Sequence, residues 1–304
     1  MRRFFQAAED RRTAYRIHGE GPLRVLLLHA LTGGPDAADA PGVKGWWAPI
    51  FRPGAPLGPE VATVYTPNLA GSCYGTQVAR PEGGYTTRFQ AEVLAEWLRA
   101  EDLRFDVLLG ASLGGMVGLE LALAEPGRFG RTAVIGCGAR AEAWLWGTNE
   151  AQRAILASPT LGDAEAIALA RRAGMLTFRS PAGLAGRFQD AASLQAWLAF
   201  HGKALADRFT RSAYLAMLEA MDQHDVGRGR GGLREALAGL GGPLHVLGLN
   251  PDHLFSRACL EELVEAARAA GRLGCVRWVD SPHGHDAFLI EWDPVVAWLK
   301  EVVA

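Results

Sequence analysis

The stretch Gly110-Ala111-Ser112-Leu113-Gly114 has the form Gly-x-Ser-x-Gly. A strand-like apolar run, residues 105–109, precedes it, and a helix-like run, residues 115–124, follows it. In that setting the pattern predicts a nucleophile elbow, a sharp strand-to-helix turn that holds the serine hydroxyl clear of a sheet. An ordinary glycine-rich turn can carry the same five residues, because the motif is short and often matched by chance. The flanking elements, and the partners found downstream, favour the elbow.

Other apolar runs predict the strands of a mostly parallel sheet. A strand that is buried on both faces reads as a continuous apolar run. Such runs occupy residues 24–28, 61–66, 131–137, 243–249 and 275–279. Helix-type spacing lies between them, notably at 86–99 and 257–270, and a last helix is expected to begin near Ala287 and to be interrupted at Asp293-Pro294. Alternating strands and helices predict an α/β fold, with a mostly parallel sheet flanked by helices.

The alternation stops between residues 139 and 232. This segment is alanine-rich and helical in pattern, and it ends in Gly227-Arg228-Gly229-Arg230-Gly231-Gly232, a composition typical of a flexible return. The predicted organisation is therefore a core made of residues 1–138 and 233–304, with residues 139–232 inserted as a helical lid.

The composition argues against several classes of protein. The 304 residues are 49% hydrophobic, enough for one large domain or a core with an insertion. A formal net charge of −2, with scattered basic residues, favours neither nucleic acid nor an anionic membrane surface as a partner. No apolar run approaches the ~20 residues of a membrane-spanning helix. The 4 cysteines are far apart, form no metal-type pair, and are expected to be thiols in a reducing cytoplasm.

Ser112 needs a base within hydrogen-bond reach and a third group to orient that base. In the α/β-hydrolase fold the partners follow in the order serine, acid, histidine, each at the carboxyl end of a strand. The strand that ends at residue 249 leads into Asp252, and the strand that ends at residue 279 leads into His283 and His285. We take Asp252 as the acid and His285 as the base. His285 follows a glycine at the start of the last helix, where a loop can lean the imidazole over the sheet edge.

Alternatives remain at each of these positions. Asp280 is a second candidate acid, and Asp252 could instead cap the helix that follows it. His29 and the other histidines are expected to be structural or at the surface, and none of their combinations has metal-ligand spacing, so no metal is predicted. The small-residue loop at residues 29–34 follows an early strand, where this fold provides the second N–H group of an oxyanion hole.

With these motifs in place, the chain resembles the homoserine O-acetyltransferases, a family with the α/β-hydrolase fold. The resemblance covers nearly the whole chain, and several of its motifs lie in the lid, which generic hydrolases do not share. It rests on His29-Ala30-Leu31-Thr32-Gly33, Gly45-Trp46-Trp47, Asn68-Leu69-Ala70-Gly71-Ser72-Cys73-Tyr74-Gly75-Thr76, Gly110-Ala111-Ser112-Leu113-Gly114-Gly115-Met116, Leu176-Thr177-Phe178-Arg179-Ser180, Ala220-Met221-Asp222-Gln223-His224-Asp225-Val226, Asp252-His253-Leu254-Phe255 and Gly284-His285-Asp286-Ala287-Phe288-Leu289.

The resemblance implies a ping-pong acyl transfer in methionine biosynthesis. Ser112 would take an acetyl group from acetyl-CoA, and the hydroxyl of L-homoserine would then remove it. His285 would act as general base and acid, with Asp252 as its orienter. The N–H groups of Leu31 and Leu113 would form the oxyanion hole.

Substrate recognition and assembly are also implied. Arg179 would bind the carboxylate of the amino acid, since a guanidinium matches a carboxylate. Asp286 would bind its ammonium group, and Thr32 is counted with them as substrate-binding. Without the resemblance, we would expect Arg179 to be a surface arginine of the lid and Asp286 to be an N-terminal helix cap. The family further implies acetyl-CoA as a substrate with no bound cofactor, and a homodimer formed through the lid. The composition predicts a cytoplasmic location, and neither nucleic acid nor membrane as a partner.

Two departures from the family pattern leave the substrates open. Residues 76–80 read Thr-Gln-Val-Ala-Arg where Thr/Ser-Thr-Gly-Pro is usual, and residues 208–212 read Arg-Phe-Thr-Arg-Ser where Arg-Phe-Asp-Ala-Asn is common. The acyl donor could thus be acetyl- or succinyl-CoA, and the acceptor homoserine or serine. An esterase with the same triad differs only in whether water or an alcohol reaches the acyl-serine. A non-catalytic protein that kept the fold is a further alternative, against which an intact triad argues.

Overall fold

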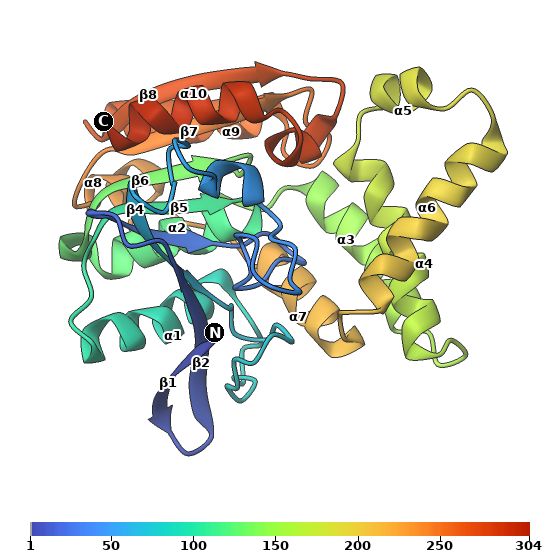
Figure 1. Ribbon diagram of the computed structural model, residues 1–304, viewed down its shortest axis with the longest axis horizontal. Coiled ribbons are helices and arrows are strands. Elements are labelled where there is room, and N and C mark those ends of the chain that lie inside the picture. The colour runs from blue at the N-terminus through green and yellow to red at the C-terminus, as the bar shows by residue number, and fades with distance from the viewer. Residues whose placement is uncertain (1) are drawn as a thin grey trace.

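The computed structural model describes residues 2–304. At its centre is an 8-stranded sheet in the order β1-β2-β4-β3-β5-β6-β7-β8 (Figure 1). The strands from β3 onward pair in parallel with their neighbours. They are β3 (Leu23–Leu28), β4 (Ala62–Pro67), β5 (Phe105–Ala111), β6 (Phe129–Ile135), β7 (Leu244–Asn250) and β8 (Leu273–Asp280). This arrangement confirms the predicted α/β fold with a mostly parallel sheet.

The first two strands form an antiparallel hairpin that the apolar runs did not predict. β1 (Arg3–Ala8) pairs with β2 (Arg11–His18), and β2 joins the sheet by antiparallel pairing with β4. β1 lies at the sheet edge and is almost wholly exposed. It therefore lacks the continuous apolar run by which the buried strands are recognised.

Helices cover both faces of the sheet, and the two-residue period of the strands decides which side chain faces which layer. In β3, Leu26 and Leu28 pack into the core shared with helices α1 (Thr87–Ala100), α2 (Leu113–Ala124) and α9 (Arg257–Ala269). Val25 and Leu27 pack into the opposite core, with η1 (Ala48–Phe51) and α10 (Trp292–Val303). Figure 1 shows α10 across the sheet from α1 and α2.

A group of helices follows β6, in the region predicted to be the lid. It contains α3 (Ala143–Leu156), α4 (Asp163–Phe178), α5 (Pro181–Arg187), α6 (Ala191–Ala206) and α7 (Arg211–Asp222), after which the short α8 (Leu233–Ala238) leads back to β7. The side chains of Ser180, Asp190 and Thr210 cap α5, α6 and α7. Figure 1 shows the group beside the sheet rather than over one of its faces, with α7 nearest the core.

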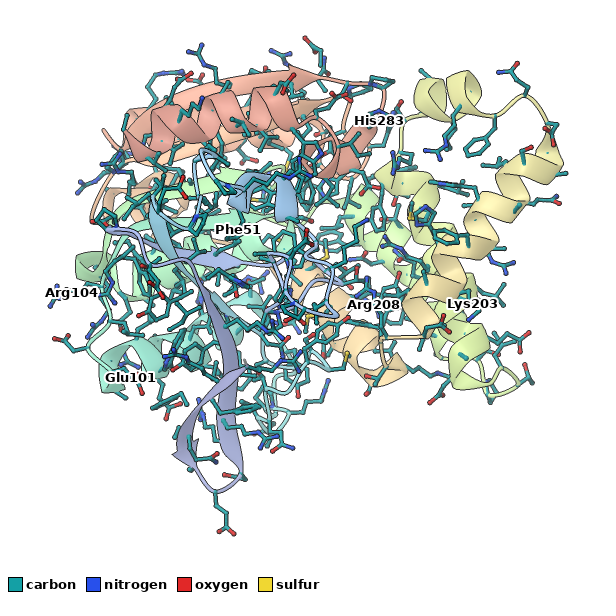
Figure 2. The ribbon with its side chains drawn as sticks, viewed as in Figure 1. Phe51, Glu101, Arg104, Lys203, Arg208 and His283 are labelled. Atoms are coloured by element: carbon teal, nitrogen blue, oxygen red, sulfur yellow. The ribbon has the colours of Figure 1, made fainter. Side chains whose placement is uncertain are left out.

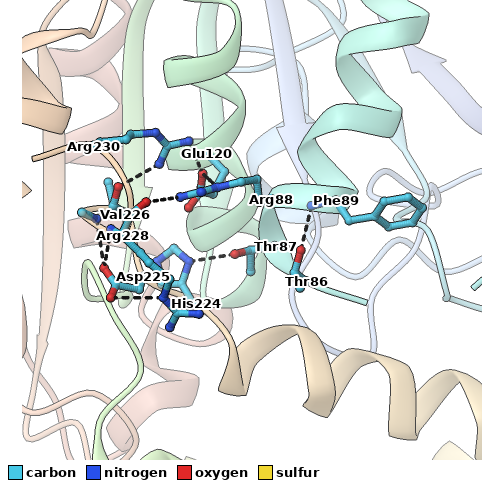
Figure 3. A network of polar contacts seen from close by, with 11 residues as sticks. Thr86, Thr87, Arg88, Phe89, Glu120, His224, Asp225, Val226, Arg228 and Arg230 are labelled. Atoms are coloured by element: carbon cyan, nitrogen blue, oxygen red, sulfur yellow. Dashed lines mark hydrogen bonds and ion pairs between the residues drawn. The ribbon is translucent and has the colours of Figure 1, made fainter. Parts of the chain in front are cut away.

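The glycine-rich return after α7 is anchored, in contrast to the flexible turn expected from its composition (Figure 3). Glu120 of α2 is 1% exposed, and its Oε2 accepts hydrogen bonds from Arg230 at 2.6 Å and Arg88 at 3.2 Å. His224 donates from Nε2 to the carbonyl of Gly138 at 3.3 Å and accepts from the Thr87 hydroxyl at 3.0 Å. Arg230, which lies between glycines of the return, thus contacts a buried carboxylate, and this contact across the fold holds the return.

The C-terminal helix also differs from the expectation. A 3₁₀-helix, η3 (Gly284–Leu289), comes first, and α10 begins only at Trp292. Pro294 does not interrupt a helix. It lies in the first turn of α10, where a missing N–H group leaves no intrahelical bond unmade. Among the helices of the described chain, none combines the length and apolar character that crossing a membrane requires.

Candidate active site

Ser112 lies at a strained turn between β5 and α2. Its backbone has φ 54° and ψ −126°, a conformation that residues with side chains rarely adopt. The flanking glycines are required by close backbone contacts. A Cβ on Gly110 would lie 2.2 Å from the carbonyl oxygen of Gly114, and a Cβ on Gly114 would lie 2.2 Å from that of Leu28. The turn therefore has the geometry that the Gly-x-Ser-x-Gly pattern predicts.

Asp252 and His285 form a buried hydrogen-bonded pair. Oδ2 of Asp252 lies 2.7 Å from Nδ1 of His285. Oδ1 of Asp252 accepts the backbone N–H groups of Leu254 at 2.7 Å and Phe255 at 3.0 Å. The two backbone N–H groups fix the carboxylate, and its other oxygen accepts a hydrogen bond from Nδ1 of His285. In a neutral His285 the proton therefore stays on Nδ1, and Nε2 carries the free lone pair.

The alternative acid lies elsewhere. Asp280 is exposed, and its Oδ1 accepts a hydrogen bond from Asn250 at 2.6 Å. The cap of α9 is Ser256, whose hydroxyl accepts the N–H of Cys259 at 3.1 Å, so Asp252 is not needed for that purpose. The structure thus brings Asp252, and not Asp280, to His285.

His285 has a free nitrogen and lines the same cavity as the serine. Nε2 of His285 is buried and has no hydrogen-bond partner among residues 2–304. It shares a cavity with Ser112, although the two side chains are not hydrogen-bonded to each other. Catalytic hydrogen bonds are often long in a free enzyme and tighten when substrate binds. The rings of Phe178, Phe255 and Phe288 surround the imidazole, with centroids 6.2, 5.5 and 5.8 Å away.

Opposing effects set the basicity of His285. Burial, the largest effect, lowers the pKa of His285, whereas the charge and hydrogen bond of Asp252 and the charge of Asp286 raise it. The raising effects prevail, and the pKa lies above its ordinary value. The imidazole is therefore a stronger base than an ordinary histidine.

The predicted oxyanion residues flank Ser112. Leu31 lines the catalytic cavity, and Leu113 is the first residue of α2, where helix N–H groups have no intrahelical partner. Within the described chain, neither backbone N–H is engaged in a hydrogen bond.

His29 holds the loop that contains Leu31. Its Nε2 accepts the N–H of Leu69 at 3.1 Å, and its Nδ1 donates to the carbonyl of Ala30 at 2.8 Å. Burial lowers the pKa of His29 to about 4. A neutral, fully partnered imidazole has the structural role expected for this residue.

The two residues predicted to bind the acceptor pair with each other. Nε of Arg179 lies 3.0 Å from Oδ2 of Asp286, an ion-pair distance without hydrogen-bond geometry. Nη1 of Arg179 lies 3.3 Å from Nδ1 of His283, which Figure 2 shows beside the lid. Asp286 lines the catalytic cavity, but Arg179 does not.

One charged residue of the cavity was missed by sequence reasoning. Arg171 of α4 lines the cavity together with Ser112 and His285. It lies outside the motifs described above and is followed by a second arginine, Arg172, on the same helix, so no local signal distinguishes it.

The catalytic cavity is small, about 50 Å³, and larger hollows lie elsewhere. One of about 510 Å³ is lined by Arg80, Ser212 and Glu219, and no histidine is among its lining residues. Another, of about 300 Å³, shares Thr32 with the catalytic cavity. There Arg208 donates to the carbonyl of Thr32 at 2.7 Å, and Figure 2 shows Arg208 where the lid meets the core. The chemistry of the lining residues, rather than the volume, identifies the candidate site.

Comparisons with known proteins agree with the observed fold. Residues 24–289 match the sequence profile of the alpha/beta hydrolase fold. A homoserine O-acetyltransferase of Thermus thermophilus is 36% identical over 305 residues, covering 89% of this chain and 79% of that protein. One of Nostoc punctiforme is 34% identical, covering 95% of this chain and 88% of that protein.

Solved structures share the fold. A homoserine O-acetyltransferase from Staphylococcus aureus has a TM-score of 0.80 at 24% identity and covers 94% of this chain and 88% of its own. Esterase E22 has a TM-score of 0.81 at 14% identity and covers 97% and 94%. Transferases and esterases thus fold alike, and at these identities the likeness shows the fold alone.

Proposed function

Because the chain belongs to the homoserine O-acetyltransferase family of the α/β-hydrolase fold, we propose that it transfers an acetyl group from acetyl-CoA to the hydroxyl of L-homoserine. The observation that carries the proposal is the buried Asp252–His285 pair, whose histidine has a free Nε2 and lines a small cavity together with the elbow serine. Acetyl-CoA is then a substrate, and the reaction itself calls for no bound cofactor.

In the first half-reaction Ser112 Oγ attacks the thioester carbonyl, and Nε2 of His285 takes the hydroxyl proton. The carbonyl oxygen becomes negative and is held by the N–H groups of Leu31 and Leu113, worth about 10²–10³ in rate for each donor. Collapse of the tetrahedral intermediate breaks the carbon–sulfur bond. The departing coenzyme A thiolate takes the proton from the His285 imidazolium and leaves acetyl-Ser112.

The second half-reaction repeats the chemistry with an alcohol. His285 takes the proton of the homoserine hydroxyl as its oxygen attacks acetyl-Ser112, and returns that proton to Ser112 Oγ as the ester bond breaks. Asp252 stabilises the imidazolium in both steps without itself becoming protonated. O-acetyl-L-homoserine is the product.

Water exclusion favours transfer over hydrolysis. Ser112 and His285 are 3% and 4% exposed, and phenylalanine rings surround the imidazole. A cavity of about 50 Å³ leaves little room for water beside an acetyl group. We therefore propose that the acceptor alcohol displaces the remaining solvent when it binds.

Recognition of the acceptor rests on charge. Asp286 offers a carboxylate to the ammonium group of a zwitterionic acceptor, and Thr32 adds a polar wall. Arg179 would take the acceptor carboxylate after exchanging its ion pair with Asp286, so that each charged group keeps an opposite partner. Serine as the acceptor and a succinyl donor remain alternatives. Residues 139–232 as a separate lid domain, a homodimer formed through that lid and a cytoplasmic location remain predictions.

The experiment measures release of coenzyme A from acetyl-CoA with and without L-homoserine, and follows the acetyl group by mass spectrometry. The proposal expects release that depends on the acceptor, with O-acetylhomoserine formed and Ser112→Ala inactive. If coenzyme A is released equally slowly in both reactions and acetate is the product, the protein is an esterase and not a transferase. Parallel reactions with L-serine and with succinyl-CoA identify the acceptor and the donor.

A further inference from the structure

A hollow of about 300 Å³ adjoins the catalytic cavity, with which it shares Thr32. We call it the outer hollow, and its lining includes Thr32, Asp36, Lys44, Trp46, Tyr74 and Arg208. The hollow lined by Arg80 is larger but has no lining residue in common with the catalytic cavity. Since a cavity of about 50 Å³ holds little more than an acyl group, the rest of a large acyl donor has to lie outside it. The outer hollow is the space next to it.

Two cations of the outer hollow have no counter-ion among residues 2–304. Lys44 is exposed and forms no ion pair. Arg208, at the meeting of lid and core in Figure 2, uses Nη1 to donate to the Thr32 carbonyl at 2.7 Å and to the Tyr74 hydroxyl. Within the described chain its Nε and Nη2 make no hydrogen bond. These two nitrogens form the edge with which a guanidinium binds two oxygens of a phosphate.

The carboxylates near these cations are already engaged. Asp36 lines the outer hollow, and its oxygens lie 2.6 Å from Nε of Arg16 and 3.2 Å from Nη2 of Arg2. Asp39 accepts the backbone N–H of Gly45 at 2.8 Å and is not part of the lining. The lining therefore carries surplus positive charge and attracts anions.

Aromatic side chains form another part of the lining. Trp46 is half-buried and fixed, since its indole N–H donates to the carbonyl of Gly34 at 2.9 Å and its ring stacks on Trp47 with centroids 5.5 Å apart. The ring of Tyr74 packs against Gly34, where a Cβ would lie 2.6 Å from it. Nucleotide bases stack on aromatic rings. A fixed indole beside two unpaired cations therefore suits a ligand that joins a base to phosphates.

We propose that the outer hollow binds the phosphorylated nucleotide of the acyl donor, with Lys44 and Arg208 on its phosphates and Trp46 beside its base. This inference rests on the proposed function, in which coenzyme A carries the acyl group. The thioester end enters the catalytic cavity past Thr32, and the nucleotide stays outside. Contacts to this remote part of the donor then position the thioester at Ser112.

The test compares two donors with the same thioester, acetyl-CoA and S-acetylpantetheine, which lacks the nucleotide. The rate of acetyl-enzyme formation is measured without acceptor, at donor concentrations far below saturation. Lys44→Met removes one unpaired cation. Lys300→Met removes an exposed, unpaired lysine of α10 that is not part of the lining, and is the matched control. Arg208→Met also breaks the hydrogen bond to Thr32, so both donors are needed to interpret it.

The measured quantity is the ratio of the acetyl-CoA rate to the S-acetylpantetheine rate. Lys44→Met should lower this ratio about 3- to 10-fold, between the effect of an exposed ion pair and that of a hydrogen bond to a charged group. Arg208→Met should lower it about 10- to 100-fold, and a loss common to both donors reports the contact with Thr32. Lys300→Met should leave the ratio within about 2-fold. Added salt should slow acylation by acetyl-CoA more in the wild type than in Lys44→Met.

Two results would overturn the inference. One is a ratio that neither Lys44→Met nor Arg208→Met changes, and the other is a wild-type protein that reacts equally fast with both donors. If neither donor forms acetyl-enzyme, the proposed function fails instead. Calorimetric binding of adenosine 3′,5′-bisphosphate then tests the outer hollow by itself. Weaker binding to Lys44→Met than to the wild type and Lys300→Met would support the inference, and equal or undetectable binding in all three would refute it.

Discussion

Replacement of Asp252 by asparagine changes one atom of the site and should remove its base. The side-chain amide oxygen is expected to face the backbone N–H groups of Leu254 and Phe255, because those two donors now bond Oδ1 at 2.7 and 3.0 Å. An amide NH₂ placed there would set donor against donor. The NH₂ group of Asp252→Asn therefore points at Nδ1 of His285, the position now occupied by Oδ2 at 2.7 Å.

This contact selects the wrong tautomer of His285. An NH₂ group donates to Nδ1, so the imidazole proton moves to Nε2, the nitrogen that has to take the proton of Ser112. A protonated Nε2 cannot accept the serine proton. Loss of the Asp252 charge also removes an effect that raises the pKa of His285, so burial, the largest effect, lowers that pKa further. The analogous change in serine proteases lowers kcat about 10⁴-fold, equal to about 5 kcal/mol of transition-state stabilisation.

The assay is the rate of acetyl-enzyme formation from acetyl-CoA, measured together with the thermal unfolding temperature. We expect Asp252→Asn to lose about 10⁴ in rate while unfolding close to the wild type, because its size and its two backbone hydrogen bonds are retained. Asp280→Asn is the matched control, since it alters the exposed alternative acid, and it should keep its rate within about 2-fold.

Two results would refute this reasoning. Asp252→Asn with more than about a tenth of the wild-type rate would mean that the tautomer of His285 does not depend on Asp252. An Asp280→Asn enzyme as slow as Asp252→Asn would move the acid to the other strand end.

Three further predictions follow from the buried charged and titratable groups. Asp252 and Asp286 outweigh the effect of burial and raise the pKa of His285 above 6.5, so kcat/KM should increase as the pH rises through this raised pKa. A value of kcat/KM that stays constant between about pH 5 and 8 would contradict the prediction. Burial lowers the pKa of His29 and His224 to about 4, so below pH 6.5 the unfolded chain binds protons that the folded chain does not. The free energy of unfolding should therefore fall as the pH is lowered from about 6.5 to 4, by about 3 kcal/mol for each histidine. The pKa shift of His285 has the opposite sign, so its contribution to stability is present below the ordinary histidine pKa and is lost as the pH rises through the raised pKa. Urea unfolding at a series of pH values measures the sum of these contributions. A free energy of unfolding that stays constant down to pH 4 would contradict the prediction. Glu120→Ala leaves the partly exposed Arg88 and Arg230 without their shared carboxylate and should lower the free energy of unfolding in urea by about 1–3 kcal/mol. The surface change Glu235→Ala is the control and should lower it by less than about 0.5 kcal/mol. Equal losses would mean that the buried network does not stabilise the fold.

The fold and the arrangement of the site were largely predictable from the sequence. Strands covered on both faces appear as continuous apolar runs, and the carboxyl ends of parallel strands meet at one edge of a sheet. Ser112, Asp252 and His285 each follow such a run, so their proximity could be inferred from chain order alone. The edge strand β1 escaped because it is exposed, and the end of the chain was misread because η3 and α10 merge into one apolar pattern.

The pairing of charged residues was decided by the tertiary structure alone. Arg171 and Arg179 lie at the same helix, and the residue pattern gives both the same expectation, a charged side chain on a lid. In the structure Arg179 pairs with Asp286 and does not line the cavity, whereas Arg171 lines it together with Ser112 and His285. Hydrophobic periodicity is local and survives in the sequence, but an ion pair depends on distances between residues far apart in the chain. Those distances exist only after α4 has packed against its neighbours and η3 has brought Asp286 beside it.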